Sequence, residues 1–201
     1  MFLRQRRSVV VPIITFVVLA LVRVHAAILS PQSADVFAEK IELIRDQKVR
    51  PGTQRTPLTE DEFNSWFMYR GQKVLPAGVA KPQLTIVGEG QLAAQAVVDL
   101  DAVARRRARG GSSFDPLSLI GGTVPVTVSG LLHTRGGKAR FEVQSAAISG
   151  IPVPVTVLQE LVGYYSRTPE RPEGVRLDET FTLPSGIQQV EIGRGQAVVV
   201  Q

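Results

Sequence analysis

The chain has 201 residues and a formal net charge of +5, from 23 lysines and arginines against 18 aspartates and glutamates. It contains no cysteine, which excludes a disulfide framework, thiolate metal ligands, a thiol nucleophile and the modified cysteine of bacterial lipoproteins. We therefore expect apolar burial alone to hold the fold together.

The first 26 residues have the pattern of a secretory signal peptide. Arg4, Arg6 and Arg7 precede an uncharged apolar run over residues 9–22, and Ala26 stands at a suitable cleavage site. The run of 14 residues is shorter than the roughly 20 residues that a membrane-spanning helix needs. We therefore predict cleavage and export, with an uncleaved N-terminal anchor as the alternative.

Loss of residues 1–26 removes four arginines and leaves 19 basic against 18 acidic side chains. Nucleic-acid binding requires a concentrated excess of positive charge, so we expect no nucleic-acid partner. Residues 27–201 are long enough for one compact domain, which we predict to be periplasmic or otherwise extracytoplasmic.

Helical spacing marks the first part of this domain. Phe37, Ile41 and Ile44 recur at intervals of four and three, which predicts a helix over residues 33–47 with Ser33 as its cap. The next ten residues, 48–57, contain two prolines and a glycine and predict a linker.

A second helix follows a capping box formed by Thr59 and Glu62. Phe63, Trp66 and Phe67 then make an aromatic stripe at positions i, i+3 and i+4. Such spacing is typical of a helix face buried in a core, and a wall that faces an apolar ligand is the alternative.

The pattern becomes alternating from residue 82 onward, which indicates strands. We predict strands over 82–87, 92–100, 123–133, 140–144, 176–183, 187–192 and 196–201. Leu158, Leu161, Val162 and Tyr165 interrupt them with a short amphipathic helix. The order of elements predicts an α+β fold with a mostly antiparallel sheet.

Small residues occupy several positions on the predicted apolar faces of these strands. They are Ala94, Ala96, Gly130, Ser145 and Ala147. Small side chains leave space above a sheet, which a closely docked helix fills or which forms a groove for an acyl chain. Both interpretations stay open.

The sequence offers little catalytic or metal-binding chemistry. His133 is the one histidine after residue 26, and it has no Gly-x-Ser-x-Gly nucleophile motif to serve. Asp99 and Asp101 are too few for a calcium loop, and a strand end that exits to solvent explains them. We therefore predict no enzyme, no cofactor and no metal.

Four arginines form the strongest charge cluster after residue 26. They are Arg105, Arg106, Arg107 and Arg109. A solvated loop or helix face accounts for such a run, and contact with anionic lipid head groups at a membrane surface is the alternative.

Three segments resemble uncharacterised secreted bacterial proteins related to the tubular lipid-binding group, which includes bactericidal/permeability-increasing-type and bacterial phospholipid-binding proteins. The segments are Leu58–Asn64, Ile148–Pro154 and Leu183–Ile187. The resemblance implies a curved, mostly antiparallel sheet packed on one long N-terminal helix plus short helices. It also implies a lipid held in the apolar interior, and it carries no catalytic residue across.

Two functions follow as predictions. The first is an extracytoplasmic lipid-binding or lipid-transfer module that holds a phospholipid or other acyl lipid between sheet and helices and touches membranes peripherally. Its predicted lipid-binding residues are Phe37, Ile41, Phe63, Trp66, Phe67, Ala94, Ala96, Leu158 and Leu161. The alternative is a non-enzymatic structural or interaction protein of the cell envelope, with a fully packed core and a protein partner bound at a sheet edge.

Overall fold

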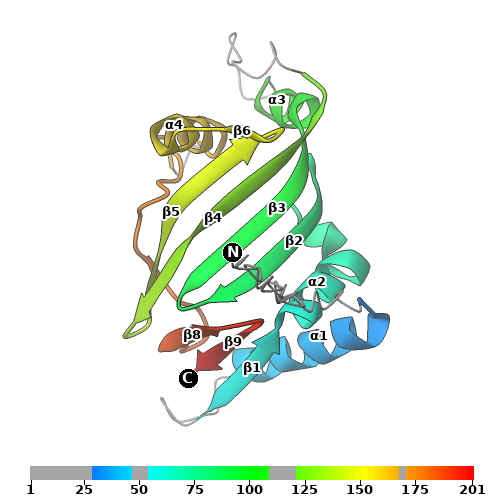
Figure 1. Ribbon diagram of the computed structural model, residues 1–201, viewed down its shortest axis with the longest axis vertical. Helices are drawn as coiled ribbons and strands as arrows, with labels where there is room; N and C mark the ends of the chain where they lie inside the picture. The colour runs from blue at the N-terminus through cyan, green and yellow to red at the C-terminus, as the bar shows by residue number, and fades with distance from the viewer. Residues whose placement is uncertain (1–28, 47–53, 109–120, 168–170) are drawn as a thin grey trace, which may run out of the picture.

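A computed structural model describes residues 29–46, 54–108, 121–167 and 171–201 (Figure 1). In this part of the chain, a long antiparallel sheet stands beside a smaller layer in which two helices lie against three strands. The predicted α+β class with mostly antiparallel strands is confirmed.

The described residues form four α-helices, one 3-10 helix and nine strands. The helices are α1 (Pro31–Arg45), α2 (Glu60–Tyr69), η1 (Gly71–Val74), α3 (Leu100–Ala108) and α4 (Val155–Tyr165). The strands are β1 (Arg55–Thr59), β2 (Val79–Gly88), β3 (Gln91–Asp99), β4 (Thr123–Arg135), β5 (Lys138–Ile148), β6 (Ile151–Pro152), β7 (Phe181–Thr182), β8 (Gln189–Gly193) and β9 (Gln196–Val200).

The strands form two antiparallel sheets. The large sheet has the order β2-β3-β4-β5-β6, and β7 adds to the free side of β5. The small sheet has the order β1-β9-β8. Helices α1 and α2 lie near β1 and the β2 edge, whereas α3 and α4 lie at the opposite end of the large sheet (Figure 1).

The large sheet has one apolar and one polar face, because directly paired residues share a face. Leu84, Ala94, Val128 and Ala146 pair in a row across four strands and define the apolar face. The adjacent row on the other face, the polar face, consists of Thr85, Ala93, Ser129 and Ser145.

One part of the predicted face assignment is wrong. Simple alternation along β5 predicted Ser145 and Ala147 on the apolar face, but the register of β4 and β5 shifts beside Gly130 and brings Ala146 there. The two backbones are so close at this point that a Cβ on Gly130 would lie 2.2 Å from the carbonyl oxygen of Glu142. Glycine is therefore the residue that permits the bulge.

Helix α1 begins earlier than predicted. The side chain of Ser30, not of Ser33, caps the helix, and it accepts a hydrogen bond from the amide of Ser33 at 3.0 Å. Pro31 occupies the first helical position, where the missing amide proton costs no hydrogen bond. The capping box of Thr59 and Glu62, in contrast, is confirmed at the start of α2.

Three predicted segments differ in the structure. Residues 55–57 of the expected linker belong to β1, which pairs with β9, and residues 47–53 lie outside the described part. Of the strand expected over 176–183, only β7 forms. Helix α3 begins at Leu100, where a strand end that exits to solvent was expected, and the carboxylate of Asp99 accepts the amide of Ala102 at 2.9 Å in its first turn.

The described core lies between the two N-terminal helices and the small sheet. Its buried members are Phe37 and Ile44 from α1, Leu58 from β1, Ile187, and Val199 from β9. Partly buried apolar side chains of α2 and β8 pack around them. The small sheet and the helices therefore depend on each other for burial.

Helix α2 completes the outer edge of β2 with side chains. The Asn64 amide donates to the carbonyl oxygen of Leu84 and accepts from its N–H, each at 2.8 Å. The Glu60 carboxylate accepts the N–H of Ile86 at 2.7 Å, and the Ile86 carbonyl oxygen accepts the N–H of Gly195 at 2.8 Å. These bonds satisfy backbone groups that an edge strand otherwise leaves unpaired.

We expect Asn64→Ala to lower the free energy of unfolding by about 2 kcal/mol, because the backbone N–H and C=O of Leu84 both lose their partner. Urea unfolding followed by circular dichroism measures this change. Gln72→Ala is the control, since it removes an exposed amide and should change stability by about 0.5 kcal/mol or less. Equal effects of the two substitutions would contradict the edge role of Asn64.

An exposed ion pair joins the two outer strands of the small sheet. The Arg55 guanidinium on β1 donates two hydrogen bonds to the carboxylate of Glu191 on β8, across the central strand β9. The hydrogen bond from Arg55 lowers the pKa of Glu191 below its ordinary value. The pair therefore stabilises the fold above the ordinary glutamate pKa, and this contribution is lost as the pH falls through the folded-state pKa.

Comparison with Glu191→Gln measures this contribution. We expect the wild-type chain to be more stable than the variant at about pH 6 and the difference to shrink as the pH falls below the ordinary glutamate pKa and through the lowered pKa of Glu191. Urea unfolding at several pH values gives the difference, and Arg55→Gln should show the same convergence. A pH-independent difference would show that the ion pair is not its source.

Candidate functional site

Five of the predicted lipid-binding residues meet between α1 and α2. The rings of Phe37 and Phe63 have centroids 4.8 Å apart, and those of Phe37 and Trp66 are 5.6 Å apart. Phe67 meets Trp66 edge-on at 5.5 Å, and Ile41 packs against the same core. The helical spacing that predicted a common face for these residues was therefore sound.

These five residues line a groove of about 370 Å³, which we call the α1–α2 groove. The other lining residues are Ala38, Glu42 and Arg45. Phe37 is only 5% exposed and belongs to the core, whereas Phe63, Trp66 and Phe67 are partly buried. The aromatic stripe thus closes the core and also forms the floor of a shallow surface groove.

Gly71, at the start of η1, sets the position of the Trp66 ring. A Cβ at this residue would lie 2.7 Å and 2.8 Å from two ring carbons of Trp66. Such distances are too short for carbon atoms, so the ring packs where only a glycine leaves room. The backbone turn after α2 therefore supports the aromatic cluster directly.

The other four predicted residues lie elsewhere. Ala94 and Ala96 lie on β3, between β2 and β4, and are partly buried on the apolar face of the large sheet. Leu158 and Leu161 are partly buried on α4, at the opposite end of the sheet from α1 and α2 (Figure 1). The nine residues therefore form three separate groups.

A second apolar pocket lies between α2, η1 and β2, and sequence reasoning missed it. This α2–β2 pocket has a volume of about 660 Å³. It is lined by Leu29, Asn64, Phe67, Met68, Gln72, Leu75, Val79, Ala80, Lys81, Pro82 and Gln83. Phe67 is the one described lining residue that was predicted to bind lipid. The other lining residues come together only when α2 docks against β2, and a local sequence pattern does not show this docking.

A β-bulge forms one wall of this pocket. Ala80 pairs with Val97 and Gln83 pairs with Gln95, so the two residues between Ala80 and Gln83 stand opposite a single residue of β3. Lys81, the first of the two, has a φ of +48°, in the left-handed region that lysine rarely adopts. The bulge shapes the wall of the pocket, because it changes the direction in which the side chains of β2 point.

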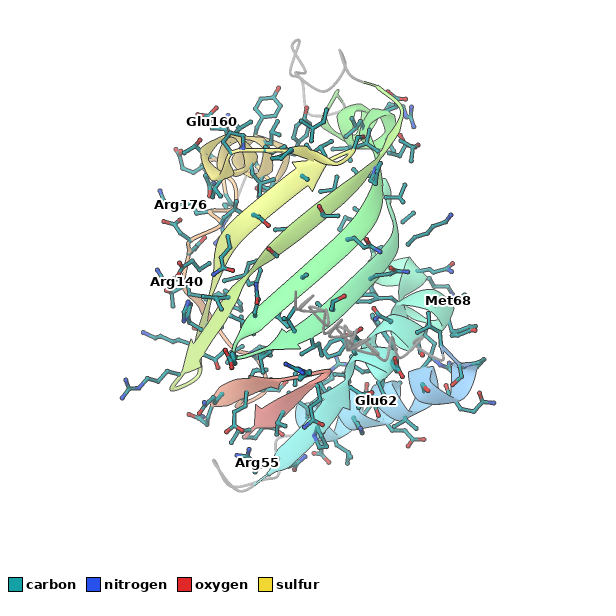
Figure 2. All side chains as sticks on the ribbon, viewed as in Figure 1. Arg55, Glu62, Met68, Arg140, Glu160 and Arg176 are labelled. Carbon is teal, nitrogen blue, oxygen red and sulfur yellow. The ribbon has the colours of Figure 1, made fainter. Side chains whose placement is uncertain are left out.

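Exposed apolar side chains accompany the pocket on α2 and η1. Met68 lines it and is 51% exposed, and Tyr69 and Val74 are 43% and 68% exposed (Figure 2 labels Met68). Of these three side chains, Met68 alone is among the described lining residues of the pocket.

A third depression, of about 680 Å³, lies where the β4–β5 hairpin passes β8. It is open and is lined by charged groups of both signs, including Glu89, Arg135 and Lys138. His133 also lines it, and its Nε2 atom lies 3.1 Å from the carboxylate of Glu142. The imidazole is exposed, as predicted for a surface histidine.

The arginine cluster is only partly described. Arg105, Arg106 and Arg107 belong to α3, and the Arg105 side chain is 69% exposed and 4.0 Å from the Asp99 carboxylate. Arg109 lies outside the described residues. The first part of the run therefore lies on a helix, which is one of the two settings expected for it.

Within the described ranges, no group of histidine and acidic side chains is arranged to hold a metal ion. Asp101 accepts the amide of Gly122 at 3.0 Å, so it acts in backbone hydrogen bonding at the base of α3. None of the helices in these ranges has both the length and the apolar composition needed to span a bilayer.

Comparison of the chain with protein-family models, with curated proteins and with solved structures finds no match. The geometry of the sites described above is therefore the basis on which a function is inferred.

We expect Gly71→Ala to destabilise the fold by about 1–3 kcal/mol, because the added methyl group forces the Trp66 ring out of its position. Trp66 is the one tryptophan of the chain, so its fluorescence emission should shift in the folded variant. Gly193→Ala is the control, since a Cβ there would lie no closer than 3.7 Å to its neighbours. An unchanged emission and stability in Gly71→Ala would contradict the tight contact.

Proposed function

We propose that this protein is a lipid-binding or lipid-transfer module that acts outside the cytoplasm and holds an acyl chain in the α2–β2 pocket. The observation that carries the proposal is a predominantly apolar cavity of about 660 Å³ accompanied by exposed apolar side chains. Pockets of about 300–1,000 Å³ with apolar linings and few polar groups are typical of sites for small apolar ligands.

The chemistry of the lining supports an acyl ligand. Phe67, Met68, Leu75 and Val79 offer apolar surface, and the methionine side chain adapts to flexible ligands. The buried amide of Asn64 bonds both backbone groups of its β2 neighbour, so it presents no free polar group to the cavity. An alkyl chain would therefore displace water from beside Asn64 without leaving its bonded amide unpaired.

Export and membrane contact are parts of the same proposal. A secretory signal peptide over residues 1–26 would bring the protein to the envelope, and the arginines of α3 would attract anionic head groups. The sequence resemblance to the tubular lipid-binding group implies a curved sheet on a long N-terminal helix, and it agrees with a lipid ligand. Such a protein would exchange lipid with a membrane that it touches only peripherally.

We expect Ala80→Phe to weaken binding of a fluorescent fatty acid about tenfold or more, because the ring fills the pocket. Ala80 lines the cavity, whereas Ala77 is exposed in the preceding turn and does not. Ala77→Phe is therefore the matched control and should bind as the wild type does. Titration of the probe followed by its own fluorescence gives the affinities.

Two further measurements distinguish this pocket from the other predicted sites. Ligand in the α1–α2 groove would change the emission of Trp66, which lines that groove and not the α2–β2 pocket. Ligand on the apolar face of the large sheet would be displaced by Ala94→Leu combined with Ala96→Leu. If Ala80→Phe binds the probe like the wild type, and the ligand changes Trp66 emission or is lost in the double leucine variant, the α2–β2 pocket is rejected as the site.

A protein-interaction role has one observation in its favour. Among the described strands, β6 pairs with residues 147 and 148 of β5, and β7 pairs with residues 138 and 139. Residues 140–145 between them have a strand partner on the β4 side only. An extended segment of another protein could add to this edge, and absence of any lipid binding would favour this function.

A further inference from the structure

We propose that the α2–β2 pocket selects amphiphiles with an anionic head group, which Lys81 binds at the rim while the chain enters the cavity. This inference depends on the proposed lipid-binding function and adds the class of ligand. Of the eleven lining residues that the structure describes, Lys81 is the single charged one, and none of these eleven carries a carboxylate. A lone cation beside an apolar cavity complements a ligand with one negative charge and one apolar chain.

Lys81 has no ion-pair partner among the described residues, in contrast to Lys40 on α1 and Arg70 at the end of α2. Lys40 lies 2.6 Å from a carboxylate oxygen of Glu62, and Arg70 pairs with Asp35. A paired cation has its charge compensated by the protein. No described side chain compensates the ammonium of Lys81, which is therefore the group that an incoming anion would meet.

The backbone at Lys81 provides an independent argument. The bulge places this residue at the pocket wall with a positive φ, a conformation for which glycine or asparagine is better suited than lysine. Backbone strain of this kind concentrates at functional sites, where a side chain has to be held in a particular place. The bulge thus explains how an exposed lysine comes to line an apolar cavity, with its alkyl stem along the wall and its charge in solvent.

The test compares three ligands of equal chain length: dodecanoate, dodecyl phosphate and the uncharged dodecanol. Binding to the full chain is measured by displacement of the fluorescent fatty acid. We expect wild-type protein to bind at least one of the two anions about tenfold or more tightly than the alcohol. Tighter binding of the phosphate identifies a phosphorylated head group, and tighter binding of dodecanoate identifies a carboxylate.

Substitutions at Lys81 then assign the preference to its charge. Lys81→Gln should bind the anions about as weakly as the alcohol and bind the alcohol like the wild type, whereas Lys81→Arg should keep the preference. Lys73→Gln is the matched control, because it removes the same charge from the exposed surface of η1 outside the pocket lining. Added salt should weaken anion binding and leave alcohol binding unchanged.

The outcomes separate this inference from the proposed function. Equal affinity for anion and alcohol in the wild type, or an unchanged preference in Lys81→Gln, would overturn head-group selection by Lys81 while lipid binding stands. Failure of all three ligands to bind the wild-type chain would overturn the proposed function itself.

Discussion

The edge of β2 is the constraint on which the rest of this structure depends. A strand at the end of a sheet carries unpaired backbone groups, and here the side chains of Asn64 and Glu60 satisfy them in place of another strand. These bonds fix helix α2 beside the large sheet. Because α2 also packs on α1 and the small sheet, the same contacts hold the two layers of the molecule together.

The α2–β2 pocket lies where the contacts between helix α2 and strand β2 stop. Asn64 and Glu60 hold the helix against Leu84 and Ile86, but the bulge immediately before them turns the backbone of β2 out of regular register. Pro82, within the bulge, has no N–H to offer to a helix side chain. The helix and the strand therefore separate at this point, and apolar side chains line the space between them.

Local signals in the sequence predicted local structure well. The capping box of Thr59 and Glu62 and the alternation along β2, β3 and β4 depend on neighbours a few residues away, and these elements formed as expected. Strand β1 and the Gly130 bulge could not be predicted in the same way, because each is decided by a distant strand. The α2–β2 pocket has the same origin, since the bonds that position α2 join residues about twenty positions apart. Helical spacing places two of the predicted site residues on one face of α1 and three on one face of α2, and the packing of α1 on α2 brings these five together.

The small sheet places a strong condition on how the chain folds. Its central strand β9 pairs Val200 with Arg55, so strands far apart in the sequence meet in one sheet. Contacts between residues so far apart in the sequence slow folding, because a long segment has to be ordered before they form. The core around Val199 closes only when β9 takes its place between β1 and β8. Helices α1 and α2 thus lack the apolar surface of Val199 until β9 has been synthesised and has paired with β1.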